Sequence, residues 1–274
     1  SSIFVDKSGT VWIGTINSGV FFLKNGNLQA LDCPNLQEVA IRDIIQDTKG
    51  NIWFASEGKG LSVYNSTNSC THYSTEAYTA LPNNRVTAIE ISASGSVWAG
   101  TTAGLVSISK GEINAISDFA GLSITDLLED AQGRLWVGTT KGLARMNGTQ
   151  IEWMDGEKEL LGKYINSVSF DRENNLWVAT KGLGLLRVRD GKFLNFNKKM
   201  GLSASVINYV CQVKENEFWI GSDEGTVDIL KDNVVTNYPL PSQLKNSRIK
   251  DIYKDSQGNV WIGTYKGLLK ITPE

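Results

Sequence analysis

Tryptophan recurs through this 274-residue chain at a nearly constant interval. Seven of the eight tryptophans follow one another at steps of 41, 45, 38, 41, 42 and 42 residues, each inside a short string of similar residues such as Val-Trp-Ile-Gly-Thr. The seven are Trp12, Trp53, Trp98, Trp136, Trp177, Trp219 and Trp261. A period of about 40 residues indicates a chain built from repeated supersecondary units that bury their apolar faces against one another.

Each repeat has the pattern of antiparallel strands. An apolar run comes first and is followed by Asp-x-x-Gly, six to three residues before the tryptophan, which is typical of a tight turn. The tryptophan strand, a glycine turn, a third strand such as 60–64 and a more polar fourth strand such as 192–196 follow. The third and sixth repeats replace the aspartate with Ser92 and Val213.

Four strands in about 40 residues predict one blade of a β-propeller, so the chain is expected to be an all-β, seven-bladed β-propeller. A β-solenoid is the alternative, but its end repeats would need caps. The last repeat ends too early for a fourth strand, and its blade is therefore predicted to have three strands. The expected blades are 1–40, 41–84, 85–122, 123–163, 164–204, 205–246 and 247–274, within a single domain 1–274.

The repeated residues are interpreted as packing groups. A large aromatic ring in the second strand fills the space between neighbouring sheets, and its indole N–H needs a hydrogen-bond partner. Two residues later the chain always has glycine or alanine, such as Gly100 or Ala179. We expect a larger side chain there to clash with the next blade.

The residues around the repeated tryptophans resemble those of a known family. Asp255-Ser-Gln-Gly-Asn-Val-Trp-Ile-Gly-Thr264 and the corresponding segment 130–139 are similar to the two-component regulator propeller repeat. The resemblance implies an extracytoplasmic, periplasmic sensor region of a bacterial hybrid histidine kinase or diguanylate cyclase receptor. Such regions carry one or two propellers, a β-sandwich, a membrane helix and an output domain. Carbohydrate breakdown products are the signals that the resemblance suggests.

Composition excludes several classes of site. A net charge of -2 gives no overall basic character for nucleic acid, and no apolar run is long enough to cross a membrane, so we expect no membrane contact within this segment. One histidine and three widely spaced cysteines predict no metal site, no cofactor and no disulfide framework. A bond between Cys33 and Cys70 is not expected, because it would have to join outer strands of adjacent blades. His72 is expected at the surface.

Strand direction divides the molecule into two faces. The turns between second and third strands and the connections between blades share one face, here called face X, while the Asp-x-x-Gly turns lie on the opposite face, called face Y. Loops on a rigid scaffold are favoured binding positions. The turn residues on face X include Asn17, Glu57, Lys59, Lys141, Lys181, Asp223, Glu224, Tyr265 and Lys266.

A second group on face X lies at the start of the first strands. Eleven residues before each tryptophan the chain is always polar: Ser1, Arg42, Thr87, Thr125, Asn166, Asn208 and Lys250. The apolar positions on either side are an odd number of residues apart, so a regular strand cannot bury both, and a bulge or bend must intervene. From both groups and their neighbours the predicted ligand-binding residues are Arg42, Lys59, Arg85, Lys141, Tyr164, Lys181, Arg248, Lys250 and Tyr265. Such a set suits an oligosaccharide or an acid.

Three functions remain open. A non-catalytic ligand sensor acting through the rest of its parent receptor is favoured, and a protein-interaction or assembly propeller of a cell-surface or secretion system is the alternative. An enzyme would need a nucleophile–base pair or paired carboxylates, and none is evident in the pattern. Asp43, Asp126 and Asp251 could form an acidic cluster, but they come from different blades. A homodimer through the open edge of the last blade is a further expectation.

Overall fold

The computed structural model describes residues 2–154, 160, 162–189 and 192–272, and the chain divides into two compact units, Ser1–Gly156 and Glu157–Glu274. The first unit contains four antiparallel sheets of four strands each. Its strands are β1 (Ser2–Val5), β2 (Val11–Gly14), β3 (Val20–Lys24), β4 (Asn27–Ala30), β5 (Ile41–Gln46), β6 (Ile52–Ser56), β7 (Gly60–Tyr64), β8 (Cys70–Tyr73), β9 (Val86–Ile91), β10 (Val97–Thr101), β11 (Gly104–Ser109), β12 (Glu112–Ile116), β13 (Ile124–Glu129), β14 (Leu135–Thr139), β15 (Gly142–Asn147) and β16 (Gln150–Trp153).

The second unit contains two four-stranded sheets and one three-stranded sheet. Its strands are β17 (Ile165–Phe170), β18 (Leu176–Thr180), β19 (Leu185–Arg189), β20 (Lys192–Phe196), β21 (Ile207–Lys214), β22 (Glu217–Ser222), β23 (Val227–Lys231), β24 (Val234–Tyr238), β25 (Ile249–Lys254), β26 (Val260–Thr264) and β27 (Gly267–Ile271). The only helical segments among the described residues are three short 3-10 turns, η1 (Pro34–Leu36), η2 (Ser117–Phe119) and η3 (Lys198–Met200).

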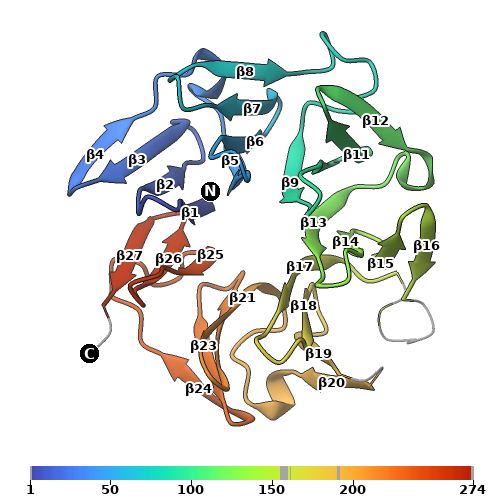
Figure 1. The fold of residues 1–274 in the computed structure, drawn as a ribbon. Coiled ribbons are helices and arrows are strands. Elements are labelled where there is room, and N and C mark those ends of the chain that lie inside the picture. The colour runs from blue at the N-terminus through green and yellow to red at the C-terminus, as the bar shows by residue number, and fades with distance from the viewer. Residues whose placement is uncertain (1, 155–159, 161, 190–191, 273–274) are drawn as a thin grey trace. The chain divides into compact units, whose positions relative to one another are not determined.

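This is the fold of a seven-bladed β-propeller, and both the blade count and the three-stranded seventh blade are confirmed. Within the first unit the first strands of successive blades lie side by side, β1 next to β5, β5 next to β9 and β9 next to β13 (Figure 1). The same holds in the second unit for β17, β21 and β25. In each blade the strands follow in chain order from that strand to the fourth.

The sequence required a bulge or a bend in the first strands, and the structure has a bulge near their start. In blade two the register shifts between Ile41 and Asp43, so the extra residue is Arg42, one of the polar positions. Corresponding shifts occur in blades three to seven. The bulge turns the polar side chain away from the core while both apolar neighbours stay buried. Ser1, the corresponding position of blade one, lies outside the described residues.

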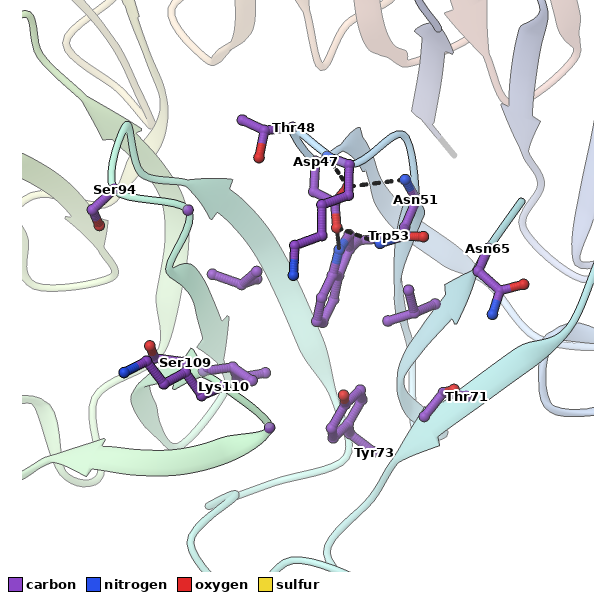
Figure 2. Close-up of a pocket in the computed structure, with 16 residues that line it drawn as sticks. Asp47, Thr48, Asn51, Trp53, Asn65, Thr71, Tyr73, Ser94, Ser109 and Lys110 are labelled. Atoms are coloured by element: carbon purple, nitrogen blue, oxygen red, sulfur yellow. Dashed lines mark hydrogen bonds between the residues drawn. The ribbon is translucent and has the colours of Figure 1, made fainter. Parts of the chain in front are cut away.

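Aspartate and tryptophan are joined inside the blade. In blade two Oδ2 of Asp47 accepts a hydrogen bond from the indole of Trp53 at 3.1 Å, while Oδ1 accepts from backbone amides of the turn (Figure 2). Blades one, four, five and seven repeat the bond between aspartate and indole. In blade six, which lacks the aspartate, Glu217 receives the Trp219 indole instead. Six tryptophans are buried; Trp98 of blade three is only half-buried.

The small residue after the tryptophan is required by the next blade. A Cβ atom on Gly100 would lie 2.5 Å from Cγ2 of Ile124, the residue that begins the first strand of blade four. This contact is shorter than carbon atoms tolerate, which confirms the clash expected from the sequence.

Blade seven shows what a missing fourth strand exposes. The third strand of blade two, β7, is almost wholly buried, whereas no residue of β27 is buried. Among the described residues β27 pairs only with β26 and leaves its other edge open.

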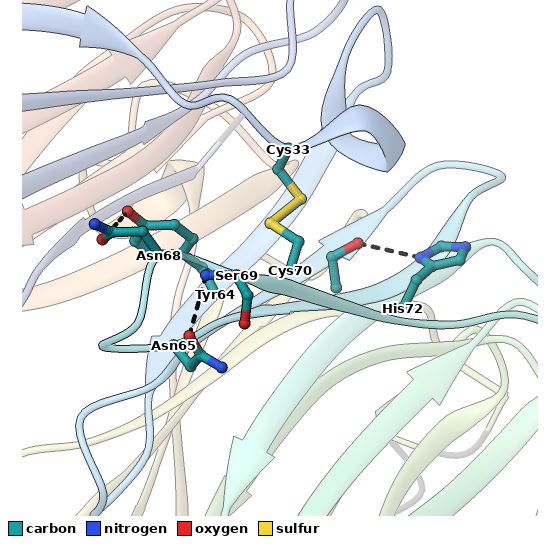
Figure 3. Close-up of a disulfide and its surroundings, with 8 residues drawn as sticks. Cys33, Tyr64, Asn65, Asn68, Ser69, Cys70 and His72 are labelled. Atoms are coloured by element: carbon teal, nitrogen blue, oxygen red, sulfur yellow. Dashed lines mark hydrogen bonds between the residues drawn. A yellow bond between two sulfur atoms is a disulfide. The ribbon is translucent and has the colours of Figure 1, made fainter.

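The structure contains a disulfide between Cys33 and Cys70, so the expectation against this bond was wrong (Figure 3). Cys33 does not lie in an outer strand. It lies in the connection just before η1, where the chain passes the outer strand β8 that begins at Cys70. The two Cα atoms are 6.0 Å apart, a usual separation for a disulfide. The bond therefore ties the connection between blades one and two to the edge of blade two.

Candidate functional site

Two predicted arginines meet on face X of the first unit. Glu57, in the turn after β6, receives Nε of Arg42 at 2.5 Å on one carboxylate oxygen and Nε of Arg85 at 2.6 Å on the other. Arg42 is the bulge residue of β5, and Arg85 precedes β9 and forms an isolated backbone bridge with Glu57. The turn, the bulge and the entry to the next blade therefore place these three side chains together, a group here called the arginine pair.

The arginine pair carries one net positive charge and faces solvent. The arginine side chains are 37% and 59% exposed, against 21% for Glu57. Partial burial acts to raise the pKa of Glu57, but Arg42 and Arg85 outweigh it and hold the pKa below its usual value. The carboxylate thus stays ionised and fixes the two guanidiniums side by side. Each guanidinium has five N–H donors, and those left over can bind a carboxylate or another anion.

Lys59 and Lys141 lie in equivalent glycine turns of blades two and four. Each turn is fixed by the hydroxyl that ends the second strand, since Ser56 Oγ accepts from the backbone N–H of Lys59 and Thr139 Oγ1 from that of Lys141. Both lysines are exposed. Lys59 shares its turn with Glu57 of the arginine pair, whereas no contact joins Lys141 to another predicted site residue among the described residues.

In the second unit three predicted residues form another group, here called the Tyr265 cluster. Arg248 pairs with Asp223, with Nη2 at 2.9 Å from Oδ2, and its guanidinium lies 5.7 Å from the centre of the Tyr265 ring. The ammonium of Lys250, the bulge residue of β25, lies 4.8 Å from the same ring. Tyr265 is 46% exposed.

The positive charges in the Tyr265 cluster act on the phenol. Partial burial works to raise the pKa of Tyr265, but Lys250 and Arg248 outweigh it, so the pKa is lowered. The cluster therefore offers an anion a lysine, an arginine and a polarised hydroxyl within one surface.

Tyr164 and Lys181 form a separate cation–π pair in blade five. The ammonium lies 5.4 Å from the ring centre, and the backbone N–H of Lys181 donates to the carbonyl of Tyr164 at 2.9 Å. Tyr164 is 37% exposed. The pair presents a cation and part of an aromatic side chain to solvent.

Several of the remaining polar bulge positions are structural ties. Thr87 Oγ1 donates to the carbonyl of Ile124 in the next blade at 2.7 Å, and Asn208 Nδ2 donates to that of Ile249 at 2.8 Å. Asn166 makes the corresponding bond to Ile207. Short polar side chains at the bulge therefore hydrogen-bond to the next blade. The longer cations at the same position, Arg42 and Lys250, instead contact Glu57 and the Tyr265 ring. The sequence alone showed that these positions are polar, but not this division.

The structure also contains a serine–histidine contact. Ser62 Oγ and His72 Nδ1 are 3.2 Å apart on the paired strands β7 and β8, so His72 is half-buried rather than a surface residue as expected (Figure 3). Burial lowers the pKa of His72. Ser62 is only 1% exposed. A substrate therefore cannot reach the hydroxyl without a change in the sheet, and the contact is best explained as cross-strand packing.

The described residues offer neither a metal site nor a membrane-spanning helix. No group of three or more His, Cys, Asp or Glu side chains there is placed to hold a metal ion. No helix of the described chain has the length and apolar character needed to cross a membrane.

Comparison with protein families matches four segments of the chain to the two component regulator propeller, residues 35–58, 118–141, 159–182 and 243–266. Each segment contains one of the repeated tryptophans. Four repeats of the chain are therefore similar to those of this family, which confirms the resemblance seen in the sequence. No curated protein sequence matches the chain.

Solved structures share the fold at low identity. The extracellular domain described as that of a hybrid two component system from B. thetaiotaomicron has 18% identity and a TM-score of 0.81, covering 98% of this chain and 37% of that one. Virginiamycin B lyase from Staphylococcus aureus has 14% identity and a TM-score of 0.80, covering 98% and 92%. YCF48 from Cyanidioschyzon merolae has 13% identity and a TM-score of 0.71, covering 98% and 93%.

Proposed function

We propose that this chain is the non-catalytic, extracytoplasmic sensing propeller of a bacterial signal-transduction receptor, and that it binds a small acidic ligand of the oligosaccharide class on face X. The observation that carries the proposal is the arginine pair. One carboxylate holds two exposed guanidiniums together, and their free N–H groups match the oxygens of an anionic ligand. The Tyr265 cluster supplies a second cationic surface of the same kind.

Two observations support a place outside the cytoplasm, with the periplasm as the proposed compartment. Disulfides persist in oxidising compartments, and this chain has one between Cys33 and Cys70. The chain also shares its fold with the extracellular domain of a two component system, although it spans only 37% of that domain. The remaining domains of the parent receptor, including a kinase output domain, are the proposed partners.

Binding without turnover is proposed because the side chains that could do chemistry are poorly placed. One neighbouring solved structure is a virginiamycin B lyase made catalytically inactive by replacement of a histidine. The single histidine of this chain lies on the outer strand β8 and contacts a buried serine. Incubation with a panel of glycans and peptides should give no product. Turnover that disappears in a face X variant such as Arg85→Gln would contradict this part of the proposal.

The binding proposal is tested by calorimetric titration of the full chain with acidic and neutral disaccharides of equal size. Acidic disaccharides should bind, and Arg42→Gln and Arg85→Gln should each weaken binding about tenfold, since hydrogen bonds between charged groups are about twice as strong as neutral ones. Lys24→Gln removes an exposed cation from the hairpin between β3 and β4 and is the matched control. Equal affinity for neutral and acidic disaccharides, or unchanged affinity in both arginine variants, would refute the proposal.

A second candidate function, a protein-interaction propeller, is favoured by the open edge of β27. Its unpaired backbone groups could accept a strand from a partner protein or from a second copy of this chain. Sedimentation of the full chain across a concentration series separates these partners, because only self-association produces a concentration-dependent homodimer.

A further inference from the structure

A pocket of about 550 Å³ lies between blades two and three, on face Y and therefore at the opposite end of the strands from the arginine pair. Blade two contributes the Asp47–Asn51 turn and strands β7 and β8, and blade three contributes the β9–β10 turn and the β11–β12 hairpin. Figure 2 shows Tyr73 at its base, with Ser94 on one wall and Asn65 on the other. The volume is typical of small-molecule sites.

The floor of this pocket is the hydrophobic core itself. Trp53, Val63, Val97 and Ile108 line it, and all four belong to one buried cluster between the two blades. Trp53 and Tyr73 are stacked, with ring centres 5.8 Å apart and planes 14° apart. A ligand entering here would therefore place an apolar face against the rings and aliphatic side chains below.

The walls carry polar groups that the protein does not use. Within the described residues the hydroxyls of Thr71, Tyr73 and Ser109 make no hydrogen bond, and neither does the side-chain N–H₂ of Asn65. In Figure 2 the Tyr73 hydroxyl points from the base toward the middle of the pocket. Hydroxyls and an amide arranged around an apolar floor match the rim and the faces of a sugar ring.

The charge of the lining favours an anion. Lys49 and Lys110 both line the pocket, and neither forms an ion pair with the described residues. The single carboxylate, Asp47, already accepts bonds from the Trp53 indole, the Asn51 amide and two backbone N–H groups. Burial acts to raise the pKa of Asp47, but these hydrogen bonds outweigh it and the pKa is lowered, so the carboxylate stays ionised. Two lysines and one carboxylate leave the lining with one net positive charge.

Small residues in blade three keep the pocket open. The blade-three turn reads Ala-Ser-Gly-Ser over 93–96, where blade four has Ala-Gln-Gly-Arg over 131–134 and blade five has Arg-Glu-Asn-Asn over 172–175. Arg134 of the blade-four turn folds back on Asp130 at 2.6 Å, and the corresponding pocket between blades three and four is smaller, about 340 Å³. The blade-three turn has no side chain of that length.

We propose that this pocket is a second ligand site that takes a single acidic sugar, meaning a polyhydroxylated ring with one carboxylate. The ring lies over Trp53 and Tyr73, its hydroxyls meet the Tyr73 and Thr71 hydroxyls, and its carboxylate lies between Lys49 and Lys110. The site is separate from the arginine pair and stands or falls independently of the function proposed above.

The site is tested by NMR titration of the ¹⁵N-labelled full chain with three probes. Galacturonate has the ring, the hydroxyls and the charge, galactose lacks the charge, and cyclohexanecarboxylate lacks the hydroxyls. Galacturonate should move the Trp53 indole N–H peak and the amide peaks of Gly95 and Gly111. The other two probes should bind at least about tenfold more weakly. Location is read directly from which peaks move, so failure here is distinct from failure of binding on face X.

Variants assign the contacts. Tyr73→Phe removes only the hydroxyl and should weaken galacturonate about threefold to tenfold, and the double variant Lys49→Gln with Lys110→Gln should weaken it by tenfold or more. Ser94→Phe should fill the pocket and abolish the shift. Lys24→Gln and, on face X, Arg85→Gln are controls that should leave it unchanged. An unmoved Trp53 peak, equal binding of cyclohexanecarboxylate, or binding unaffected by the lysine substitutions would overturn the proposal.

Discussion

The indole of Trp177 donates a hydrogen bond to Oδ2 of Asp171 at 2.8 Å, and Oδ1 of the same carboxylate accepts the backbone N–H of Asn175 at 2.7 Å. One side chain thus closes the turn before the second strand and satisfies the buried tryptophan of that strand. The six-residue spacing between aspartate and tryptophan is the distance that allows both bonds. The two most regular features of the repeat therefore form one structural unit.

Blade three lacks this unit, and restoring it should stabilise the protein. Ser92 stands where other blades have aspartate, and among the described residues the Trp98 indole has no acceptor. Ser92→Asp supplies a carboxylate at the right spacing and should raise the free energy of unfolding by about 1 kcal/mol. Urea denaturation measures the change. Asp171→Asn, which weakens the existing unit in blade five, should lower stability. A change of the same sign in the two variants would contradict this account.

The close approach of adjacent blades predicts a large effect at Gly100. Gly100→Val places methyl groups into the space that Ile124 occupies, and overpacking of this kind costs about 1–3 kcal/mol. Thermal unfolding should show a clearly lowered Tm. The matched control is Ala55→Gly, which removes a Cβ from the same position in blade two and should cost about 1 kcal/mol. A Gly100→Val protein as stable as the parent would show that the blades can separate at little cost.

Glu90 predicts a pH dependence of stability. Burial, together with the nearby carboxylates Asp43, Asp126 and Glu129, raises its pKa to about 8. The hydrogen bond that Glu90 accepts from the Glu129 backbone acts in the opposite direction. The folded state thus holds the proton more tightly than the unfolded chain, whose carboxyl has a pKa near 4.5. The tighter binding of this proton stabilises the folded state in full below about pH 4.5. This stabilisation is lost progressively as the pH rises toward 8.

Glu90→Gln keeps an acceptor for the Glu129 amide and removes the ionisable proton. The variant should be more stable than the parent by about 4 kcal/mol at pH 8 and about equal at pH 4, since each pKa unit corresponds to about 1.4 kcal/mol. Denaturation at both pH values measures the difference. A constant difference between parent and variant across this range would show that Glu90 does not titrate as described.

Much of the fold follows from the sequence because its determinants are local. The spacing of tryptophan, aspartate and glycine sets one blade, and seven copies set the blade count. Even an irregularity beside Arg42, either a bulge or a bend, could be predicted, because two apolar positions an odd number of residues apart cannot both face the core of a regular strand; the structure shows that it is a bulge.

The candidate site was only partly predictable because its pairings join different blades. The sequence placed Arg42, Arg85 and Glu57 on the same face, but nothing in it showed that one carboxylate holds both arginines. The Cys33–Cys70 bond was missed for a similar reason. Cys33 follows the outer strand of blade one, and the path of that connection over blade two depends on how the sheets pack.

The open edge of blade seven predicts where the backbone is least protected. In blade two the third strand β7 is covered by β8, whereas β27 pairs only with β26 among the described residues and has no buried residue. Amide hydrogen exchange should therefore be faster for the outward-facing N–H groups of Gly267–Ile271 than for the third strands of other blades, because they bond to water. Proline at an outward-facing position of β27 should leave monomer stability nearly unchanged and should abolish any concentration-dependent dimer, because the edge can no longer pair. Exchange in β27 as slow as in β7 at low protein concentration, with no dimer present, would contradict the prediction.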